Sequence, residues 1–444
     1  IRKDNRMLLI KNGTVIDPGS GFNKKEDVFI EGGRVKKIVS EPELSVRGEE
    51  SAGMKVIDAK GRYVLPGLVD VHVHFRDPGF TYKEDIESGA KAAAKGGFTT
   101  VVLMANTKPA VDNVETLRYV LEKGKGTGIH IETCAAVTMG MKGEALVPME
   151  ELKEAGAIGF TDDGIPLLKE ELVRQAMQRA KELGVPLSFH EEDPAYIRNN
   201  GIHAGKASAY YGIGGSAREA EITLVQRDLQ LALETGACVN IQHISTKEAV
   251  ELVRQAKRKG ADVHAEATPH HFTLNQEAAI AWGTLAKMNP PLREEEDRLA
   301  IIEGIKDGTI DLIATDHAPH SAEEKAKAVT EAPSGIIGLE TALSLGYQEL
   351  VVKAGLSMTE LMEKMALHPA RMYNLDAGYL KEGGPADLCI FDPGACWTPD
   401  RFVSRSQNSP FRGQTLKGVV TAVVSGGKII YEKMTQKGAR YGHD

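Results

Sequence analysis

The sequence of 444 residues contains no apolar run that approaches the roughly 18 residues of a membrane-spanning helix. Its first residues, IRKDNR, are charged and carry no signal-peptide pattern. Only four cysteines are present, Cys134, Cys238, Cys389 and Cys396, and none of them form a CxxC pair. These absences argue against a membrane protein, a disulfide framework and a cysteine-rich zinc site, and they favour a cytoplasmic protein with free thiols.

An excess of basic charge is also lacking. The chain has 54 lysines and arginines against 62 aspartates and glutamates, which gives a net charge of -8 with neutral histidines. The acidic excess is spread along the chain, so it argues against binding to nucleic acid. Hydrophobic residues make up 42% of the chain, enough for a sizeable core. The length suits two to three domains, or one large barrel with a smaller unit.

The two ends of the chain resemble one another. Residues 8–17, 28–39 and 422–432 are β-rich runs broken by NG or GG, dipeptides that suit the tight turns of β-hairpins. Residues 61–67 and 385–393 add further strands. These runs could form two separate hairpin clusters or one small β-sandwich domain built from both ends. We favour the single domain, with residues 7–65 and 376–444, because chain termini often lie close together.

The middle of the chain, residues 66–375, alternates apolar β-rich runs with helical patterns. This alternation predicts a (β/α)₈ TIM-like barrel of the α/β class, with an open doubly wound sheet as the alternative. The eight predicted strands are residues 68–75, 99–104, 128–137, 157–161, 186–190, 238–244, 262–267 and 311–315. Residues 338–355 and 358–375 are predicted to be closing helices.

Two histidines stand one residue apart in LVDVHVHFRDPG, residues 68–79. Residues two apart in a strand face the same side, so His72 and His74 point together. The following RDPG ends the strand, which places both histidines at its carboxyl end, where barrel enzymes build their sites. The pair alone fits metal binding and a hydrogen-bonded core pair equally well.

Polar residues also follow the other predicted strands. They are Asn106, Asp162, Asp163, His190, His243 and Asp316. Imidazole and carboxylate ligands together suit Zn²⁺, and Mn²⁺ or Co²⁺ also fit. Together with His72 and His74, these imidazoles and carboxylates exceed one tetrahedral site and indicate two metals bridged by hydroxide, so one or two metals per chain are expected.

The motifs DVHVHFRDPG, FTDDG, ATPHHFTL and ATDHAPH resemble those of the amidohydrolase superfamily, and within it the dihydroorotases of the long bacterial type. The resemblance covers nearly the whole chain. It implies the reversible cyclisation of N-carbamoyl-L-aspartate to L-dihydroorotate in de novo pyrimidine biosynthesis.

The resemblance implies the following metal ligands: His72, His74, Asp163, His190, His243 and Asp316. The first two and Asp316 would hold one metal, and His190 and His243 the other. Hydantoinases and allantoinases use a carbamylated lysine as the bridge, but AIGFTDDG, residues 157–164, has no lysine. The long bacterial dihydroorotases use the second aspartate of this motif instead, so the resemblance implies Asp163 as the bridge, with Asp162 as the adjacent alternative.

The resemblance also implies six substrate-binding residues: Arg76, Asn106, Asn289, His320, Ser334 and Gly335. Arginine suits a substrate carboxylate because its planar fork pairs with both oxygens. Asn289 fits equally well as a turn residue before Pro290. Hydroxide held between the metals would attack the ring carbonyl, and Asp316 would carry the proton.

Two other functions remain open at this point. One is an allantoinase or hydantoinase, which the missing lysine and the Arg76–Asn106 pair argue against. The other is a catalytically silent scaffold for aspartate carbamoyltransferase, which the complete ligand set argues against. The resemblance also implies a homo-oligomer or a complex with aspartate carbamoyltransferase. Residues 321–333 form either a solvated loop or a lid, and His264 is predicted to lie in the core.

Overall fold

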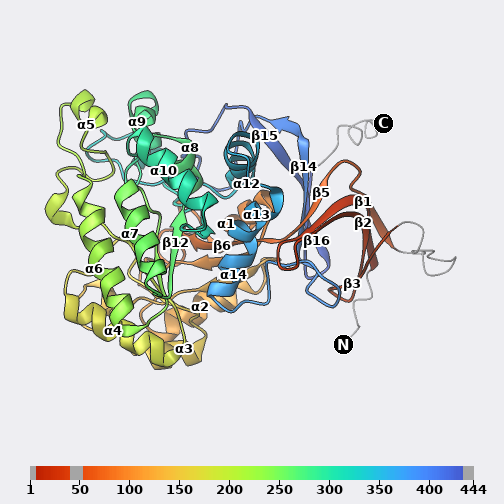
Figure 1. The fold of residues 1–444 in the computed structure, drawn as a ribbon, viewed down its shortest axis with the longest axis horizontal. Coiled ribbons are helices and arrows are strands. Elements are labelled where there is room, and N and C mark those ends of the chain that lie inside the picture. The colour runs from red at the N-terminus through yellow and green to blue at the C-terminus, as the bar shows by residue number, and fades with distance from the viewer. Residues whose placement is uncertain (1–6, 41–53, 434–444) are drawn as a thin grey trace.

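The structure is a computed structural model that describes residues 7–40 and 54–433. Strands from the two ends of the chain stand together on one side of the molecule (Figure 1, red and blue). Helices surround parallel strands on the other side (Figure 1). The chain therefore places its middle beside a sheet made from both of its ends.

The sheet of the chain ends has eight strands. Its main path runs β16-β15-β14-β5-β1-β2-β3, and β4 pairs with β1. The antiparallel pair of β5 and β14 joins the two ends, with Leu65 opposite Cys389. The strands are β1 (Met7–Asp17), β2 (Phe22–Glu31), β3 (Arg34–Val39), β4 (Lys55–Asp58), β5 (Tyr63–Pro66), β14 (Leu388–Trp397), β15 (Leu416–Ser425) and β16 (Lys428–Glu432). Two separate terminal clusters are thus excluded.

Two of the three predicted glycine turns close hairpins. Gly32 and Gly33 connect β2 to β3, and Gly426 and Gly427 connect β15 to β16, all four with positive φ. The expected turn at Asn12 is wrong, because β1 continues through it and stays paired with β2 on both sides. The register shifts there instead, so the NG dipeptide forms a β-bulge.

The predicted strands of the middle are all present, some of them shorter than expected. They are β6 (Leu68–Val73), β7 (Phe98–Leu103), β8 (His130–Thr133), β9 (Phe160–Thr161), β10 (Leu187–Phe189), β11 (Val239–Ile241), β12 (Val263–Ala267) and β13 (Leu312–Ile313). They pair in parallel as β6-β7-β8 and as β9 to β13 in order. Single parallel bridges, Ala135–Phe160 and Val73–His317, lie between the two sheets.

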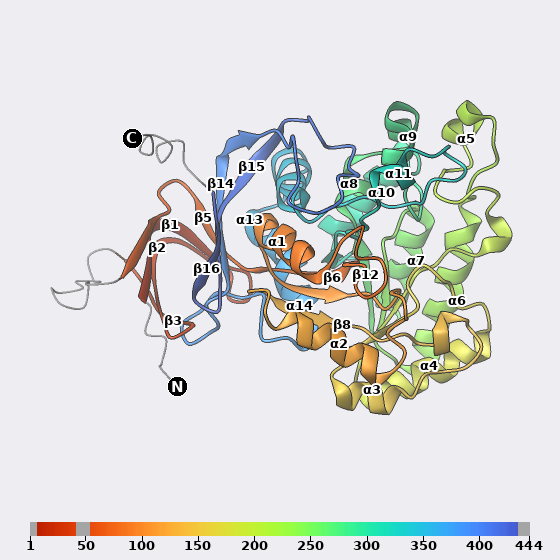
Figure 2. The same ribbon diagram turned by 180° about the vertical axis from the view of Figure 1, so that it is seen from behind.

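Helices follow most of these strands, as Figure 2 shows from behind. They are α1 (Ile86–Gly96), α2 (Val114–Gly124), α3 (Met149–Ala155), α4 (Glu170–Leu183), α5 (Lys206–Tyr211), α6 (Glu219–Thr235), α7 (Lys247–Arg258), α8 (Pro269–Thr273), α9 (Glu277–Trp282), α10 (Glu295–Lys306), α11 (Ala322–Lys325), α12 (Ala342–Gly346), α13 (Met358–Met362) and α14 (His368–Met372). Local chemistry sets their limits. In α1, the Asp85 side chain accepts the Ser88 N–H at 2.7 Å, and Gly97 ends the helix with φ 96°.

The predicted closing helices are present but interrupted. Helix α12 continues as a π-helical segment, Tyr347–Lys353, and a second one, Glu363–Leu367, lies between α13 and α14. Every residue of β6 and β7 is buried, as expected of parallel strands that helices cover. No helix within the described ranges is long and apolar enough to cross a membrane.

Candidate metal centre

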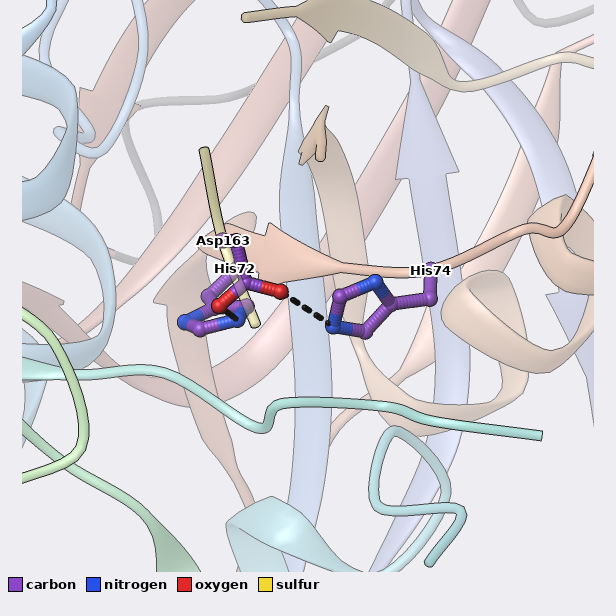
Figure 3. Close-up of side chains that lie close together, drawn as sticks. All are labelled: His72, His74 and Asp163. Atoms are coloured by element: carbon purple, nitrogen blue, oxygen red, sulfur yellow. Dashed lines mark ion pairs between the residues drawn. The ribbon is translucent and has the colours of Figure 1, made fainter. Parts of the chain in front are cut away.

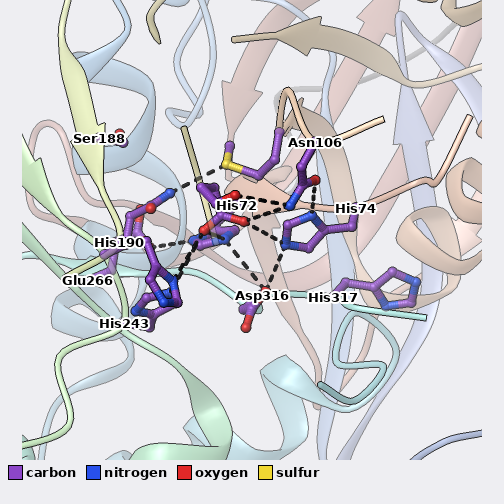
Figure 4. Close-up of polar contacts among 12 residues, drawn as sticks. His72, His74, Asn106, Ser188, His190, His243, Glu266, Asp316 and His317 are labelled. Atoms are coloured by element: carbon purple, nitrogen blue, oxygen red, sulfur yellow. Dashed lines mark hydrogen bonds and ion pairs between the residues drawn. The ribbon is translucent and has the colours of Figure 1, made fainter. Parts of the chain in front are cut away.

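The six predicted metal ligands come together at the carboxyl ends of the parallel strands. His72 lies in β6 and His74 directly after it, while Asp163 and His190 come just after β9 and β10. His243 follows β11 and Asp316 follows β13, and all six side chains are buried. Strands far apart in the sequence therefore deliver imidazoles and carboxylates to one place (Figure 4).

Asp163 lies between His72 and His74 (Figure 3). Its Oδ1 is 3.3 Å from Nε2 of His72, and its Oδ2 is 3.4 Å from Nε2 of His74. Asp316 joins this group, because its Oδ1 lies 2.9 Å from Nε2 of His74 and 3.5 Å from Nε2 of His72. Two histidines and two carboxylates thus face a common point.

The same aspartate also faces a second pair of histidines. Oδ1 of Asp163 lies 3.7 Å from Nδ1 of His190 and 3.8 Å from Nε2 of His243. The two ring nitrogens of this pair are 2.9 Å apart. Asp163 therefore belongs to both clusters of ligand atoms, which is the position that a bridging ligand requires.

The opposite nitrogen of three of these rings is bonded to a neighbouring side chain, as Figure 4 shows for His74 and Asn106. Nδ1 of His72 lies 2.9 Å from Oε2 of Glu266, and Nδ1 of His74 lies 2.9 Å from Oδ1 of Asn106. Nε2 of His190 lies 3.0 Å from Oε2 of Glu192. Each oxygen accepts a ring N–H, which fixes the other nitrogen of the ring toward the cluster. Metal-binding histidines are oriented in this way.

Two atoms of the cluster are buried and have no hydrogen-bond partner, Nε2 of His72 and Oδ1 of Asp163. Nearly all buried polar atoms in folded proteins are bonded, so such a facing pair needs an explanation. A divalent cation between them would satisfy both atoms. The donor set of imidazole nitrogens and carboxylate oxygens also fits a transition-metal site, so the residues suit the expected metal.

The carboxylates of the cluster are held in their charged form. Burial alone would raise the pKa of Asp163, but His72 and the adjoining histidines hold it well below its usual range. The pKa of Asp316 is likewise lowered, because the charges and bonds of His72 and His74 outweigh its burial. Both groups are therefore ionised at neutral pH, as metal ligands and proton acceptors must be.

Backbone strain is concentrated at this rim. Arg76, His243 and Asp316 have positive φ angles of 59°, 31° and 46°. Residues other than glycine rarely adopt this conformation, and each instance costs about 1–3 kcal/mol. The surrounding fold holds these three side chains in place at some cost in stability.

A cavity of about 390 Å³ opens beside the cluster. Of the six predicted metal ligands, all but His72 line it. The six predicted substrate-binding residues all line it as well: Arg76, Asn106, Asn289, His320, Ser334 and Gly335. The cavity therefore joins the two predicted groups in one space.

The polar groups of the cavity are arranged for an anionic ligand. Nε of Arg76 donates to the carbonyl of Pro319 at 3.3 Å, and no carboxylate in residues 7–40 or 54–433 forms an ion pair with the guanidinium. Burial and the charges of Arg76 and Lys83 lower the pKa of His320 to about 2, so its ring is neutral. Its Nε2–H donates to the carbonyl of Ser334 at 2.8 Å. Oδ1 of Asn289 is buried and has no partner within the described chain.

Asp162, the alternative bridge, points away from the cluster. Its Oδ1 accepts the backbone N–H of Val137 at 2.7 Å, and its Oδ2 accepts the hydroxyl of Thr138. It fastens the segment that follows β8. This is the opposite orientation to that of Asp163, as neighbouring positions at a strand end require.

Sequence reasoning missed three residues of the site. Glu266 and Glu192 bond two of the histidines, and Lys287 lines the cavity while donating to the carbonyl of Ala332 at 2.6 Å. The sequence does carry a signal for Glu266, which is a carboxylate between two alanines in the strand VHAEA, residues 263–267. Its side chain must point to the opposite face from theirs. No local pattern identified its partner, 194 positions earlier in the chain.

The prediction of a core role for His264 is wrong. The ring is only partly buried, and its Nδ1 lies 2.6 Å from Oδ2 of Asp311. The segment 321–333, predicted as a loop or a lid, contains helix α11. Lys325 of this helix donates to the carbonyls of Pro333 and Gly335 at 2.8 and 3.0 Å, which ties the segment to the cavity wall.

Comparison with known proteins gives relatives over nearly the whole chain. The Amidohydrolase family matches residues 63–430. The chain is 55% identical over 425 residues to the dihydroorotase of Clostridioides difficile (strain 630), across 96% of this chain and 100% of that protein. Its identity to the dihydroorotase of Clostridium acetobutylicum is 50% over 428 residues, with coverage of 96% and 100%. Among solved structures, the L-hydantoinase from Arthrobacter aurescens matches with a TM-score of 0.85 at 25% identity, over 96% of both chains.

Proposed function

Because the chain belongs to the amidohydrolase family, we propose that it interconverts N-carbamoyl-L-aspartate and L-dihydroorotate in pyrimidine biosynthesis. The protein is a cyclic amidohydrolase, and its curated relatives are dihydroorotases. The observation that carries the proposal is a buried cluster of histidines and carboxylates that opens into a cavity with an arginine on its wall.

We propose that strands β6 to β13 close into a (β/α)₈ barrel spanning residues 66–375. The bridges Ala135–Phe160 and Val73–His317 support closure, because they lie at the two gaps between the parallel sheets. Residues 7–65 and 376–444 would form the β-sandwich domain. Of these ranges, 41–53 and 434–444 lie outside the described residues. Convergence of the site at one end of the strands is the arrangement that barrel enzymes share.

We assign His72, His74 and Asp316 to one cation and His190 and His243 to a second, with Asp163 between them. The two clusters of ligand atoms that share Asp163 support this division. Zn²⁺ suits the donors best, and Mn²⁺ or Co²⁺ also fit. When bound, such cations supply Lewis-acid polarisation of the carbonyl and activation of water.

Asp316 is the proton carrier in this proposal. In the hydrolytic direction its carboxylate takes a proton from the attacking water and gives it to the ring nitrogen as the carbon–nitrogen bond breaks. In cyclisation it removes the proton from that nitrogen. Its place on the cavity wall supports the role, because its carboxylate faces the space that the substrate would fill.

Arg76 is the main anchor for the substrate carboxylate. Its two terminal nitrogens match both carboxylate oxygens, and charge-assisted pairs of this kind are the strong ones. Asn106, Asn289 and the neutral His320 add uncharged polar contacts around it. The backbone of Ser334, whose carbonyl accepts from His320, and that of Gly335 complete the wall.

An allantoinase or hydantoinase is the second candidate, favoured by the similarity to the solved L-hydantoinase. The aspartate at the bridging position and the higher identity to dihydroorotases argue against it. Assay of the purified chain with dihydroorotate, hydantoin and allantoin separates the candidates. Turnover of dihydroorotate alone is expected, and turnover of hydantoin or allantoin alone would overturn the proposal. A silent scaffold would turn over none of the three.

We also propose that the chain acts as a homo-oligomer or with aspartate carbamoyltransferase. The basis is the resemblance to long bacterial dihydroorotases. Light scattering of the purified chain, alone and with the carbamoyltransferase added, measures both masses. A monomer in both samples would contradict the proposal.

A further inference from the structure

A second group of metal-type side chains lies at the opposite end of the parallel strands from the candidate metal centre. Cys238 directly precedes β11, Asp262 directly precedes β12, and His264 is the second residue of β12. Val239 pairs with Val263, so Cys238 and Asp262 lie side by side on neighbouring strands. His264 shares the face of Asp262, because the two are two residues apart.

The three side chains place their donor atoms close together. One ligand atom from each residue lies within 4.8 Å of the others. Asp262 is exposed and the other two are partly buried, so solvent and ions can reach the group. Thiolate, imidazole and carboxylate are the three donors that Zn²⁺ binds in proteins, and three protein ligands leave its fourth position for water.

Asp311 holds the imidazole of His264. Its Oδ2 accepts from Nδ1 of His264 at 2.6 Å, which leaves Nε2 as the nitrogen for a cation. Its Oδ1 accepts the backbone N–H of Ala265 at 3.0 Å and lies 3.1 Å from Nζ of Lys257. A carboxylate behind a histidine ring is the usual support of a zinc ligand. The charge of Lys257 is offset by the same carboxylate.

We propose that Cys238, Asp262 and His264 bind one Zn²⁺ ion, with water as the fourth ligand. Binding releases the thiol proton of Cys238 to solvent, and the ion gains bonds to Sγ, Nε2 and a carboxylate oxygen. The ion fastens the start of β11 to the start of β12. This site is separate from the substrate cavity, so its loss leaves turnover intact.

Cobalt substitution in the full, reduced and metal-stripped chain tests the proposal. Thiolate bound to Co²⁺ gives a charge-transfer absorption in the near ultraviolet. The proposed ligands of the candidate metal centre include no thiol, so cobalt bound there gives no such band. We expect the band to appear in the wild-type chain, to be abolished in Cys238→Ser, and to persist in Cys396→Ser, the matched control at an exposed thiol.

Asp262→Asn provides a second test if a cysteine variant fails to fold. It should lower the affinity for Co²⁺, read from the same band, by at least about tenfold. Zinc added to the cobalt-loaded chain should remove the band, and total zinc per chain should fall by one in Cys238→Ser with dihydroorotate turnover unchanged. The absence of a band at saturating Co²⁺, or an equal band in Cys238→Ser, overturns the proposal.

Discussion

Two buried clusters of charge in this protein differ in how completely their polar atoms are hydrogen-bonded. In the first, Asp297 ties the starts of helices α6, α7 and α10 together. Its Oδ2 accepts from Arg218 at 2.7 Å and from the backbone N–H of Glu294 at 3.1 Å. Its Oδ1 accepts from Arg218 as well and from the backbone N–H of Lys247 at 2.9 Å. Both oxygens of this carboxylate are fully bonded.

The candidate metal centre is the second cluster, and it is not fully bonded. Nε2 of His72 and Oδ1 of Asp163 lie 3.3 Å apart but form no hydrogen bond, and the strained residues His243 and Asp316 lie beside them. Buried charged groups whose hydrogen bonds are complete stabilise a fold. Those that lack hydrogen bonds are tolerated where a ligand supplies the missing contacts. The comparison therefore predicts that changes in the first cluster lower stability and changes in the second lower activity.

The largest effect is expected from Asp316→Asn. An amide cannot accept the proton of water, so kcat for dihydroorotate should fall by about 10²–10⁴-fold, the usual contribution of a general acid–base. Urea unfolding of the metal-free variant checks that the loss of kcat does not come from loss of the fold. Near-normal kcat would refute the proton-carrying role of Asp316.

The next effect is expected from Asp297→Asn, and it concerns stability alone. The variant loses charge-assisted bonds to Arg218, so its free energy of unfolding should fall by about 2–3 kcal/mol near neutral pH. Urea unfolding of the metal-free chain measures this loss. A large fall in kcat with unchanged stability would break the comparison between the clusters.

The effect of Asp297 should also depend on pH. Burial would raise the pKa of Asp297, but the bonds from Arg218 hold it below its usual value. A lowered pKa in the folded state stabilises the fold above the unfolded pKa of about 3.9, and this contribution is lost as the pH falls toward the folded pKa. The difference in unfolding free energy between wild type and Asp297→Asn should therefore be full at pH 7 and shrink below about pH 4. A constant difference would contradict this origin.

A smaller effect is expected from Glu266→Gln. The glutamine amide cannot accept from both His72 and Asn240, so the ring of His72 is less well oriented. Metal affinity should fall by about 10–100-fold, measured by competition with a coloured chelator. Glu349→Gln, which changes a buried glutamate paired with Lys353, serves as the control and should leave metal affinity unchanged. Equal losses in both variants would show a general structural effect.

The smallest effect is expected from Arg76→Lys. The lysine keeps the positive charge but loses the two-pronged geometry, so KM for dihydroorotate should rise by about tenfold, or about 1.4 kcal/mol. The value of kcat should change much less, because the contact is made equally in ground and transition states. A fall in kcat at unchanged KM would place Arg76 in the chemical step instead.

The strands and their polar ends could be predicted from the sequence because both depend on local pattern. Apolar runs of the right length marked β6 to β13, and the histidines and aspartates at their ends marked one rim. Because the carboxyl ends of parallel strands lie together at one end of the fold, residues that follow different strands come together there. The hairpin at Gly426 was predictable for the same reason, as its turn requires positive φ at adjacent residues.

What could not be predicted depends on partners distant in the sequence. Alternation along β12 shows that Glu266 and its neighbours Ala265 and Ala267 point to opposite faces, but not that His72 lies beside Glu266. The bulge at Asn12 depends on its pairing with β2, because the same dipeptide could equally have closed a turn. Likewise, the position of His264 in an apolar strand predicts a core residue, but its ring pairs with Asp311, 47 positions later in the chain.

Reconstitution of the metal-stripped chain with zinc tests most directly the central claim that hydrolysis depends on metal held by the candidate metal centre. Zinc bound per chain and the rate of dihydroorotate hydrolysis are measured in the same samples. The Cys238→Ser variant is used so that only zinc at the candidate metal centre is counted. We expect no hydrolysis without metal and a rate that rises in step with bound zinc until the cluster is filled. Full hydrolysis by the stripped chain, or zinc binding that leaves the rate at zero, would contradict the account.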